Sequence, residues 1–486
     1  RDQWPFPVSD TLYEIRLLTV REQDRGGLLA ALLMYAAFRC VESRGGTQIM
    51  AMGRRALKAL YQKAGLRFFG VIIRSGAVEY ELMGAELAQL RAQLSDCTPL
   101  LCRLRFNVTW NLSFPFGVAC THGGEFFGVI GDTFQTLERR REVVNADVLD
   151  AWFPPAPGAL AAIQDHLPWL LQTSPPVDGA GLMQTIADVR GVPPESLVLG
   201  AGSSALIYLA LCRWLTPNSR VLLPDPTYGE YAHVLEQVIG CRVDRLALSP
   251  TESGRLELDH LRARLRQTSY DLVILVNPNN PTGGFLPRVD LERALADIPS
   301  QTRVWIDEAY LDYMGREESL EAAAAQSRNV FVCKSLSKCY ALSGARAAYL
   351  CGPPPLISEL RRFTPPWNVS LPAQVAAVAA LNNPAYYAQR YAETAVLRDD
   401  LVTQLRRNFP DWDIRPSPAN WALCFLPLSG PDAATIVQRC RAQNVFLRDA
   451  ASISPRLGNH TLRIAVKDAE SSTHILAALL SALAGP

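Results

Sequence analysis

The chain has 486 residues, of which 49% are hydrophobic and 20% are charged, so predominant disorder is excluded. Its 48 lysines and arginines nearly balance its 47 aspartates and glutamates, and the net charge of +1 gives no overall field to attract nucleic acid or an anionic membrane. No apolar run approaches the ~20 residues of a membrane helix. We therefore expect a soluble protein with neither a nucleic-acid nor a membrane partner.

The eleven cysteines are scattered without CxxC pairs or a zinc-like spacing, which predicts reduced thiols and a cytoplasmic protein. Cys120, His122 and Glu125 flank two glycines and could suggest a metal or thiol site. Because no fourth ligand lies nearby, the favoured interpretation is a glycine turn with incidental neighbours, and no metal site is expected. The chain starts with Arg1 and soon enters a predicted strand, so we expect the natural polypeptide to begin earlier.

The N-terminal part alternates between strand and helix patterns. A glycine-bearing turn follows its first strand, and a helix N-terminus behind such a turn offers free N–H groups that suit a pyrophosphate. In chain order the predicted elements are a strand (12–20), the turn (21–27), a helix (28–40), a strand (48–52), a helix (54–64) and two strands (68–73 and 78–83).

Residues of about 11 to 90 resemble the second half of the GNAT acyltransferase fold, through this element order and the segment RRALKALYQKAGLRFFG. In that family the turn holds the coenzyme A pyrophosphate, and Tyr61 lies where the family often has a tyrosine. The opening strands and helices of the family are absent, and Gly26-Gly27 is a reduced form of its turn. We expect a partial GNAT-like α/β domain over residues 1–94 without independent acyl transfer; a bifunctional enzyme is the alternative.

A large domain is predicted over residues 151–370, after a linker or N-terminal arm over 95–150, and a smaller α/β lobe over 371–486. Strands alternate with helices, which indicates a largely parallel sheet, and ligands bind such sheets beyond the carboxyl ends of the strands. The predicted strands of the large domain are 196–199, 221–223, 242–247, 272–276, 304–306, 330–333 and 347–350, with helices at 205–215 and 229–240. The lobe is predicted to contain strands at 421–426 and 462–466 and a helix at 470–483.

Three successive predicted strands end in residues that can bind a ligand or take part in catalysis. Asn280 follows the first, Asp307 and Tyr310 follow the second, and Lys338 follows the third. A pyridine-ring cofactor with a phosphate and a phenolic oxygen needs these residue types: Asp keeps the ring nitrogen protonated, Asn and Tyr hold the phenolate oxygen, and Lys forms an imine with the aldehyde.

Two further motifs fit the same cofactor. The turn that carries Gly202, Ser203 and Ser204 precedes a predicted helix and offers a phosphate a nest of N–H groups. Tyr228 provides an aromatic ring that could stack on the cofactor ring. Each motif alone is weak evidence for such a cofactor, but their occurrence together in this order makes a chance match remote.

The motifs PTYGEY, NPNNPTG, DEAY and SLSKCYALSGAR resemble those of the fold-type-I pyridoxal-phosphate enzymes, in particular the histidinol-phosphate aminotransferase-like branch, over roughly residues 145–484. The resemblance implies an α/β fold with a large, mostly parallel sheet domain and a small C-terminal domain. It also implies pyridoxal 5'-phosphate as cofactor, an amino-acid substrate, and a homodimer whose active sites are each built from two subunits.

Residue by residue, the resemblance makes Lys338 the Schiff-base lysine and Asp307 the partner of the pyridinium nitrogen. Tyr310 and Asn280 would hold the phenolate oxygen, and Tyr228 would stack on the ring. The implied phosphate ligands are Gly202, Ser203, Ser335, Ser337 and Arg346.

Two arginines near the C-terminus resemble the substrate-facing arginines of the family. Arg463, in TLRIAV, would clamp the α-carboxylate, and Arg448, in VFLRD, would bind a distal group, since a guanidinium suits bidentate carboxylate binding.

Two segments depart from the family pattern: Asp150–Pro155 replaces an Asn-Glu-Asn/Tyr-Pro opening, and Ser174–Pro176 replaces a Tyr-Pro-Asp whose tyrosine reaches the partner's phosphate site. Histidinol phosphate is therefore a doubtful substrate. Trp152 and Phe153 either line the pocket or form a packed hydrophobic corner.

Aminotransferase chemistry in specialised, natural-product biosynthesis is the favoured reaction. The alternative is γ-elimination or replacement, with S-adenosylmethionine as one candidate substrate and carbon–carbon bond formation as a possible sequel. Decarboxylation is disfavoured because Arg463 would retain the carboxylate.

Overall fold

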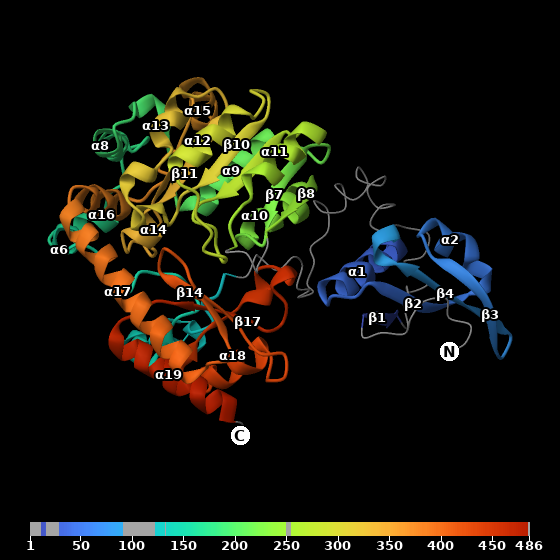
Figure 1. Ribbon diagram of the computed structural model, residues 1–486. Coiled ribbons are helices and arrows are strands. Elements are labelled where there is room, and N and C mark those ends of the chain that lie inside the picture. The colour runs from blue at the N-terminus through green and yellow to red at the C-terminus, as the bar shows by residue number, and fades with distance from the viewer. Residues whose placement is uncertain (1–10, 16–28, 91–121, 132, 249–253, 485–486) are drawn as a thin grey trace. The chain divides into compact units, whose positions relative to one another are not determined.

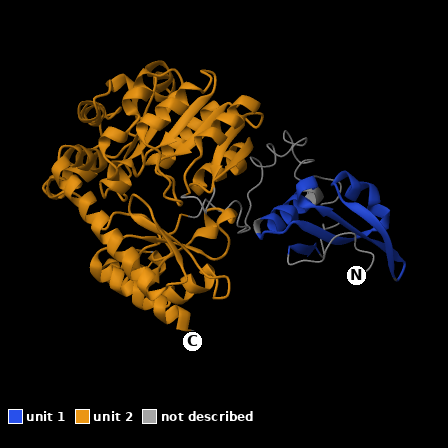
Figure 2. Ribbon diagram, viewed as in Figure 1, with its two compact units in different colours: residues 1–121 blue, residues 122–486 orange. Residues whose placement is uncertain are grey.

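The computed structural model describes residues 11–15, 29–90, 122–131, 133–248 and 254–484 (Figure 1). The chain divides into two compact units, residues 1–121 and residues 122–486 (Figure 2). In the part of the chain that is described, no helix combines the length and the apolar character needed to cross a membrane.

The N-terminal unit contains a four-stranded sheet in the order β1-β2-β4-β3, in which β1 and β2 are parallel and the other pairs are antiparallel. Its hydrophobic core joins Phe38 and Val41 of the first helix to Ile49 and Ala85 of the sheet. The described strands and helices predicted for this unit are confirmed, but the turn over 21–27 lies outside the described residues. The elements are β1 (Leu12–Ile15), α1 (Leu29–Ser43), β2 (Gln48–Arg54), η2 (Arg55–Leu57), α2 (Lys58–Lys63), β3 (Arg67–Ser75) and β4 (Val78–Glu86).

The second unit is built around a seven-stranded sheet in the order β6-β12-β11-β10-β9-β7-β8. The predicted parallel sheet is confirmed for β8, β7, β9, β10 and β11, whereas β12 runs antiparallel to both β11 and β6. The strands are β6 (Leu197–Gly200), β7 (Arg220–Asp225), β8 (Arg242–Ala247), β9 (Leu272–Val276), β10 (Arg303–Asp307), β11 (Val330–Ser335) and β12 (Ala348–Cys351).

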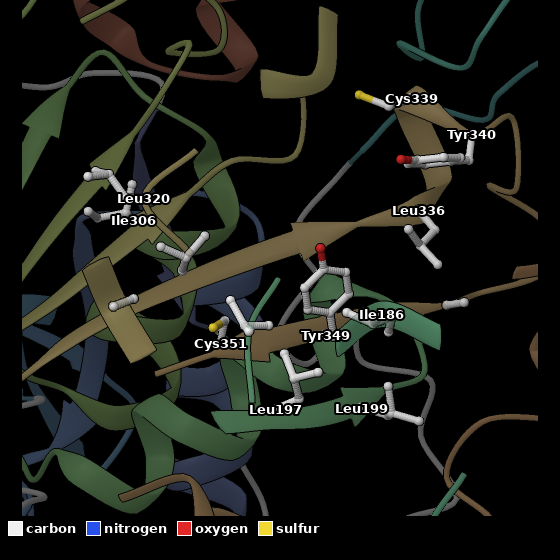
Figure 3. Packing of buried hydrophobic residues seen from close by; sticks show 14 of the residues in the cluster. Ile186, Leu197, Leu199, Ile306, Leu320, Leu336, Cys339, Tyr340, Tyr349 and Cys351 are labelled. Carbon is white, nitrogen blue, oxygen red and sulfur yellow. The ribbon is translucent and has the colours of Figure 1, made fainter. Parts of the chain in front are cut away.

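Helices cover both faces of this sheet, as its apolar central strands require (Figure 1). Alternate residues of one strand enter different cores: Leu197 and Leu199 pack in one cluster, and Val198 packs in the other. Figure 3 shows Leu197 and Leu199 of β6 beside Tyr349 and Cys351 of β12, with Ile186 of α8 close to them. The side chains therefore alternate with the period of two that a pleated strand imposes.

The helices of this part include one irregular segment. The helix predicted over 229–240 is divided into α10 (Gly229–His233) and a π-helical segment, η5 (Val234–Ile239). The other helical elements are α5 (Phe127–Ile130), η3 (Leu137–Glu142), α6 (Pro157–Gln164), α7 (Leu167–Gln172), α8 (Ala180–Arg190), η4 (Pro194–Ser196), α9 (Ser203–Trp214), α11 (Leu258–Gln267), α12 (Arg288–Ala296), η6 (Leu311–Tyr313), η7 (Arg316–Glu318), α13 (Glu321–Gln326), α14 (Leu336–Cys339), α15 (Pro354–Arg361) and α16 (Leu371–Leu381).

The C-terminal lobe contains an antiparallel sheet in the order β13-β14-β17-β16. A short strand from the predicted arm, β5, pairs with β15, and the Ala465 N–H donates to the Ala146 carbonyl at 3.0 Å. This attachment places residues 147–150 beside the lobe. The elements are β5 (Val144–Asn145), α17 (Pro384–Asn408), β13 (Asp413–Pro416), β14 (Trp421–Phe425), α18 (Ala433–Arg441), β15 (Val445–Phe446), β16 (Arg448–Asp449), η8 (Ala450–Ser452), η9 (Pro455–Leu457), β17 (Thr461–Ala465) and α19 (Ala469–Ala484).

Candidate active site

The carboxyl ends of the central strands bring the predicted motifs to one edge of the sheet. Asp307 ends β10 opposite Cys333 of β11, and the Asn277 N–H donates to the Asp307 carbonyl at 2.8 Å. At the end of β11, Ser335 is level with Ala348, which is in turn level with Gly200 at the end of β6. The motifs around Asp307, Ser335 and Gly200 therefore share one edge, as the sequence predicted.

Asp307 is a buried carboxylate with two local hydrogen bonds. Oδ2 accepts from the Tyr231 hydroxyl at 2.6 Å, and Oδ1 accepts from the Ala309 N–H at 2.9 Å. The indole N–H of Trp305 donates to the same Tyr231 hydroxyl at 2.8 Å, which orients it toward Asp307. Burial raises the pKa of Asp307, so a cationic ring N–H at this carboxylate would relieve an unfavourable buried charge. Sequence reasoning missed Tyr231, although the motif PTYGEY contains it.

The turn before α9 forms a cradle with the properties of a phosphate site. Gly202 has φ +87° and precedes a 12-residue helix without a side-chain cap, so the first N–H groups of α9 are available to an anion. A Cβ on Gly202 would clash with the Arg346 guanidinium. Arg346 also donates to the Ser337 hydroxyl at 3.4 Å, and Ser335 caps the N–H of Ser337. The cradle thus combines a guanidinium, hydroxyls and N–H groups.

Ser204 differs from its neighbours in the cradle in the hydrogen-bond partner of its hydroxyl. Its hydroxyl donates to Glu230 Oε2 at 2.9 Å, and the Tyr228 hydroxyl donates to the same oxygen at 2.9 Å. Burial would raise the pKa of Glu230, but hydrogen bonds from His122, Ser204 and Tyr228 lower it. Glu230 therefore fixes the Tyr228 ring that is expected to stack on the cofactor.

Tyr310 and Asn280 lie beside Arg463, at the junction with the C-terminal lobe. Tyr310 packs edge-on against Trp421 with 4.9 Å between the ring centroids, and burial raises its pKa. Arg463 donates to Asn280 Oδ1 at 2.8 Å and to the Asp147 carbonyl at 2.6 Å. Burial lowers the pKa of Arg463 to about 10, so the side chain remains charged at neutral pH.

The two predicted substrate arginines are neighbours that contact different groups of Asp147, Arg448 its carboxylate and Arg463 its backbone carbonyl. Arg448 and Arg463 are directly opposite each other on β16 and β17. Arg448 Nη1 lies 3.3 Å from Asp147 Oδ1, which gives it a carboxylate partner. Within the described part of the chain, Arg463 donates only to neutral oxygens and its buried Nε has no hydrogen-bond partner. Arg463 is thus a desolvated cation suited to an added carboxylate.

His122 and the glycines after it also belong to this region. The His122 ring stacks on Tyr228 with 5.2 Å between centroids, and its Nε2 lies 3.5 Å from Glu230 Oε2. Both glycines have positive φ, and a Cβ on Gly123 would clash with the Asp147 carboxylate. His122 is therefore not an incidental neighbour of the glycines, because it contacts residues of the site, whereas Cys120 lies outside the described residues. No local pattern in the sequence revealed this contact.

Lys338 comes from α14, directly after β11, and its Nζ lies 2.8 Å from Asp150 Oδ1. Trp152, two residues beyond Asp150, is directed elsewhere: its indole N–H donates to Thr394 on α17 at 2.8 Å, and its ring packs edge-on against Phe153. This geometry matches the packed-corner alternative for Trp152. Its role in substrate binding remains a prediction.

The residues at this edge fit a pyridoxal-phosphate group on structural grounds. The cradle at Gly202 suits a phosphate, the buried carboxylate of Asp307 suits a ring N–H, and the Lys338 amine suits an aldehyde.

The chain belongs to the aminotransferase class I and II family, whose model matches residues 156–479. It is 27% identical over 356 residues to a histidinol-phosphate aminotransferase of Rhodopseudomonas palustris (strain BisA53), covering 71% of this chain and 93% of the relative. It is 32% identical over 366 residues to histidinol-phosphate aminotransferase 1 of Thiobacillus denitrificans, covering 73% and 90%. The solved structure of histidinol-phosphate aminotransferase from Sinorhizobium meliloti with pyridoxal-5'-phosphate matches with a TM-score of 0.64 and 21% identity, covering 75% of this chain and 98% of that one.

These relationships confirm the fold-type-I class and the aminotransferase expected from the motifs. The enzyme depends on pyridoxal 5'-phosphate, which when bound supplies an electron sink for negative charge that develops on the substrate. The GNAT-like assignment of the N-terminal unit is not confirmed, since the family match begins at residue 156.

Proposed function

We propose that this enzyme transfers the amino group of an α-amino acid, with Lys338 holding the cofactor aldehyde. Asp307 holds the ring nitrogen, Tyr310 and Asn280 hold the phenolic oxygen, and Tyr228 stacks on the ring. The proposal is supported above all by Asp307, a buried carboxylate at the shared strand edge that accepts hydrogen bonds from one hydroxyl and one N–H and can take a cation as well. The phosphate ligands are Gly202, Ser203, Ser335, Ser337 and Arg346.

The substrate's α-carboxylate binds Arg463 in this proposal. Arg463 is the arginine with neutral hydrogen-bond partners, so a carboxylate would gain a charge-assisted bond. Arg448 already faces Asp147, which reduces its attraction for a second anion. We therefore propose an amino acid whose distal group is not a phosphate, with Arg448 and Asp147 together binding a polar group.

A half-reaction tests the proposed function. The cofactor-loaded protein is mixed with single L-amino acids, with histidinol phosphate and with S-adenosylmethionine, while spectra and product masses are recorded. Transamination predicts formation of pyridoxamine phosphate and one keto acid per active site. Products of elimination without pyridoxamine phosphate would overturn the proposal. The variant Lys338→Ala should lose the visible cofactor band.

We also propose a homodimer. Large apolar side chains are exposed near Ser174–Pro176, the segment that replaces the family's partner-reaching tyrosine, among them Leu171 (71%), Val177 (62%) and Trp367 (54%). The Trp367 N–H donates to the Val177 carbonyl at 3.1 Å, so two of these residues are adjacent. Such a patch indicates an interface. Sedimentation equilibrium should give twice the chain mass, and a fully active monomer would contradict this.

A further inference from the structure

Asp150 contacts three polar side chains, those of Lys338, Ser343 and Lys467. Its Oδ1 lies 2.8 Å from Lys338 Nζ and accepts a hydrogen bond from the Ser343 hydroxyl at 2.6 Å. Its backbone carbonyl accepts from Lys467 Nζ at 3.1 Å. Lys338 follows β11, Lys467 follows β17, and Asp150 follows β5, so this contact joins the large sheet to the C-terminal lobe.

The position of Asp150 is fixed independently of Lys338. The chain just before it is tied to the lobe by the bond between Ala465 and Ala146, and the buried Asn420 side chain donates to the Leu149 carbonyl at 3.1 Å. With Ser343 holding the carboxylate as well, Lys338 meets a preorganised acceptor. This segment is the one in which the sequence departs from the opening that its family usually has.

The charges around Asp150 favour an ionised carboxylate between two amines. Burial would raise the pKa of Asp150, but the charge of Lys338 and the hydrogen bonds from Lys338 and Ser343 lower it. Lys467 is desolvated, which lowers its pKa to about 8 although Asp150 opposes this shift. Tyr310 also interacts electrostatically with Asp150, and the neighbouring Asp468 interacts electrostatically with Lys467.

A carboxylate at hydrogen-bond distance holds an amine in place through a charge-assisted hydrogen bond. An amine must be neutral to attack an aldehyde, and afterwards it can accept or donate a proton near the substrate. The residue that holds this nitrogen therefore affects both tasks. None of the site residues assigned above performs this function.

We propose that Asp150 is the positioning residue of Lys338, which holds its amine at the strand edge by an ion pair. This inference rests on the proposed role of Lys338. Asp150 acts through Lys338 and is not itself placed on the substrate. The nitrogen that joins Lys338 to the cofactor should interact with the same carboxylate.

The first test measures the reactivity of Lys338 in cofactor-free protein. Acetic anhydride labels neutral amines, and mass spectrometry of peptides separates Lys338 from Lys467. At a fixed pH near 8, Asp150→Asn should label Lys338 about tenfold faster, since the amine loses the charge-assisted hydrogen bond that holds it. Asp150→Ser is a second neutral variant, and Asp150→Glu should restore slow labelling.

The matched control is Asp147→Asn, which removes a nearby carboxylate that is paired with Arg448 and should leave the labelling rate of Lys338 unchanged. The second readout is the pH midpoint of the visible band of the cofactor-loaded protein, which should fall in both neutral variants. If neither variant changes the labelling rate or the midpoint, Asp150 is not the counter-ion of Lys338.

These outcomes separate the inference from the proposed function. If Lys338→Ala kept the visible band, the assignment of Lys338 would fail and the inference would fail with it. If that variant lost the band while the neutral Asp150 variants behaved like the wild type, only the inference would fail. If both neutral variants change the labelling rate and the pH midpoint, and Asp150→Glu keeps the wild-type values, the inference and the proposed function are both supported.

Discussion

Asp307 shows how a single side chain is prepared for a charged ligand. Its carboxylate is buried, and the nearest donor is the Tyr231 hydroxyl at 2.6 Å. Burial raises the pKa of Tyr231 far above its ordinary value, so the phenol stays protonated and remains a donor. One hydroxyl and one N–H stabilise the carboxylate only in part, and in the proposed function a positively charged ring nitrogen would complete the site.

We expect Asp307→Asn to weaken cofactor binding by about ten- to a hundredfold, since a buried hydrogen bond between charged groups contributes about 1.5–3 kcal/mol. Titration of the cofactor-free protein while following the visible band measures the dissociation constant. Tyr231→Phe removes the donor but leaves the carboxylate, so its loss should be smaller. An unchanged dissociation constant in Asp307→Asn would refute the assignment.

The place of the candidate site residues at strand ends was predictable from sequence, but their partners were not. Lys338 and Asn280 follow apolar strands and Asp307 ends one, and position at a strand end is a local signal. Tyr231 is 76 residues from Asp307. Asp147 and Arg448 are 301 residues apart. Such pairs depend on tertiary folding, which no local pattern encodes.

At the level of helices and strands, the cradle before α9 depends on backbone geometry. Gly202 combines positive φ with a guanidinium where its Cβ would be. The helix predicted over 205–215 begins instead at Ser203, and this earlier start places free N–H groups at the turn. Hydrophobic periodicity locates the body of a helix well, but its first residue depends on the turn.

We expect Gly202→Ala to weaken cofactor binding at least tenfold and to destabilise the fold by about 1–3 kcal/mol, because the added Cβ meets Arg346 and the φ is strained. Cofactor titration and urea unfolding measure the two effects. Gly181→Ala is a matched control: it lies in α8 with no atom within 4 Å of its Cβ, and it should be neutral or stabilise by up to about 1 kcal/mol. Equal cofactor affinity and equal stability of the two variants would contradict this account.

A buried network attaches α8 to the sheet beneath the site. Arg190 of α8 lies 2.7 Å from Asp312, and Lys334 of β11 donates to the same carboxylate at 2.8 Å. Burial would raise the pKa of Asp312, but these two cations hold it well below its ordinary value. A carboxyl whose pKa is lower in the folded state contributes stability above its unfolded pKa, and the contribution is lost as the pH falls through the folded value.

We expect Asp312→Asn to destabilise the protein by about 3 kcal/mol at pH 7, because Arg190 and Lys334 each lose one of two buried carboxylate partners, while Glu321 and Glu308 remain. The difference from the wild type should narrow below about pH 4, where the unfolded carboxyl becomes protonated. Urea unfolding at several pH values measures this difference in the free energy of unfolding. Asp297→Asn, which breaks an exposed pair with Arg262, should cost no more than about 1 kcal/mol. Asp312→Asn with wild-type stability would show that the network is not stabilising.

The molecule as a whole joins two compact units that the sequence revealed to different degrees. Four ordered motifs sufficed to identify the class of the second unit. The strand in the arm could not be predicted from sequence. β5 has only two residues and pairs with β15 about three hundred residues later, which leaves no periodic signal. In the first unit, the described strands and helices were predictable, but these elements alone do not specify an activity.

The last prediction concerns the first unit, for which we expect no independent acyl transfer. Its described sheet has four strands, and Tyr61 packs near Phe68 of that sheet with 6.3 Å between ring centroids, which is a packing contact. Isothermal titration of the full chain with acetyl-coenzyme A should therefore show no saturable binding. Tyr61→Phe serves as the control, since it retains the packing. Tight, saturable binding by the wild type, lost in Tyr61→Phe, would instead make a bifunctional enzyme the better interpretation.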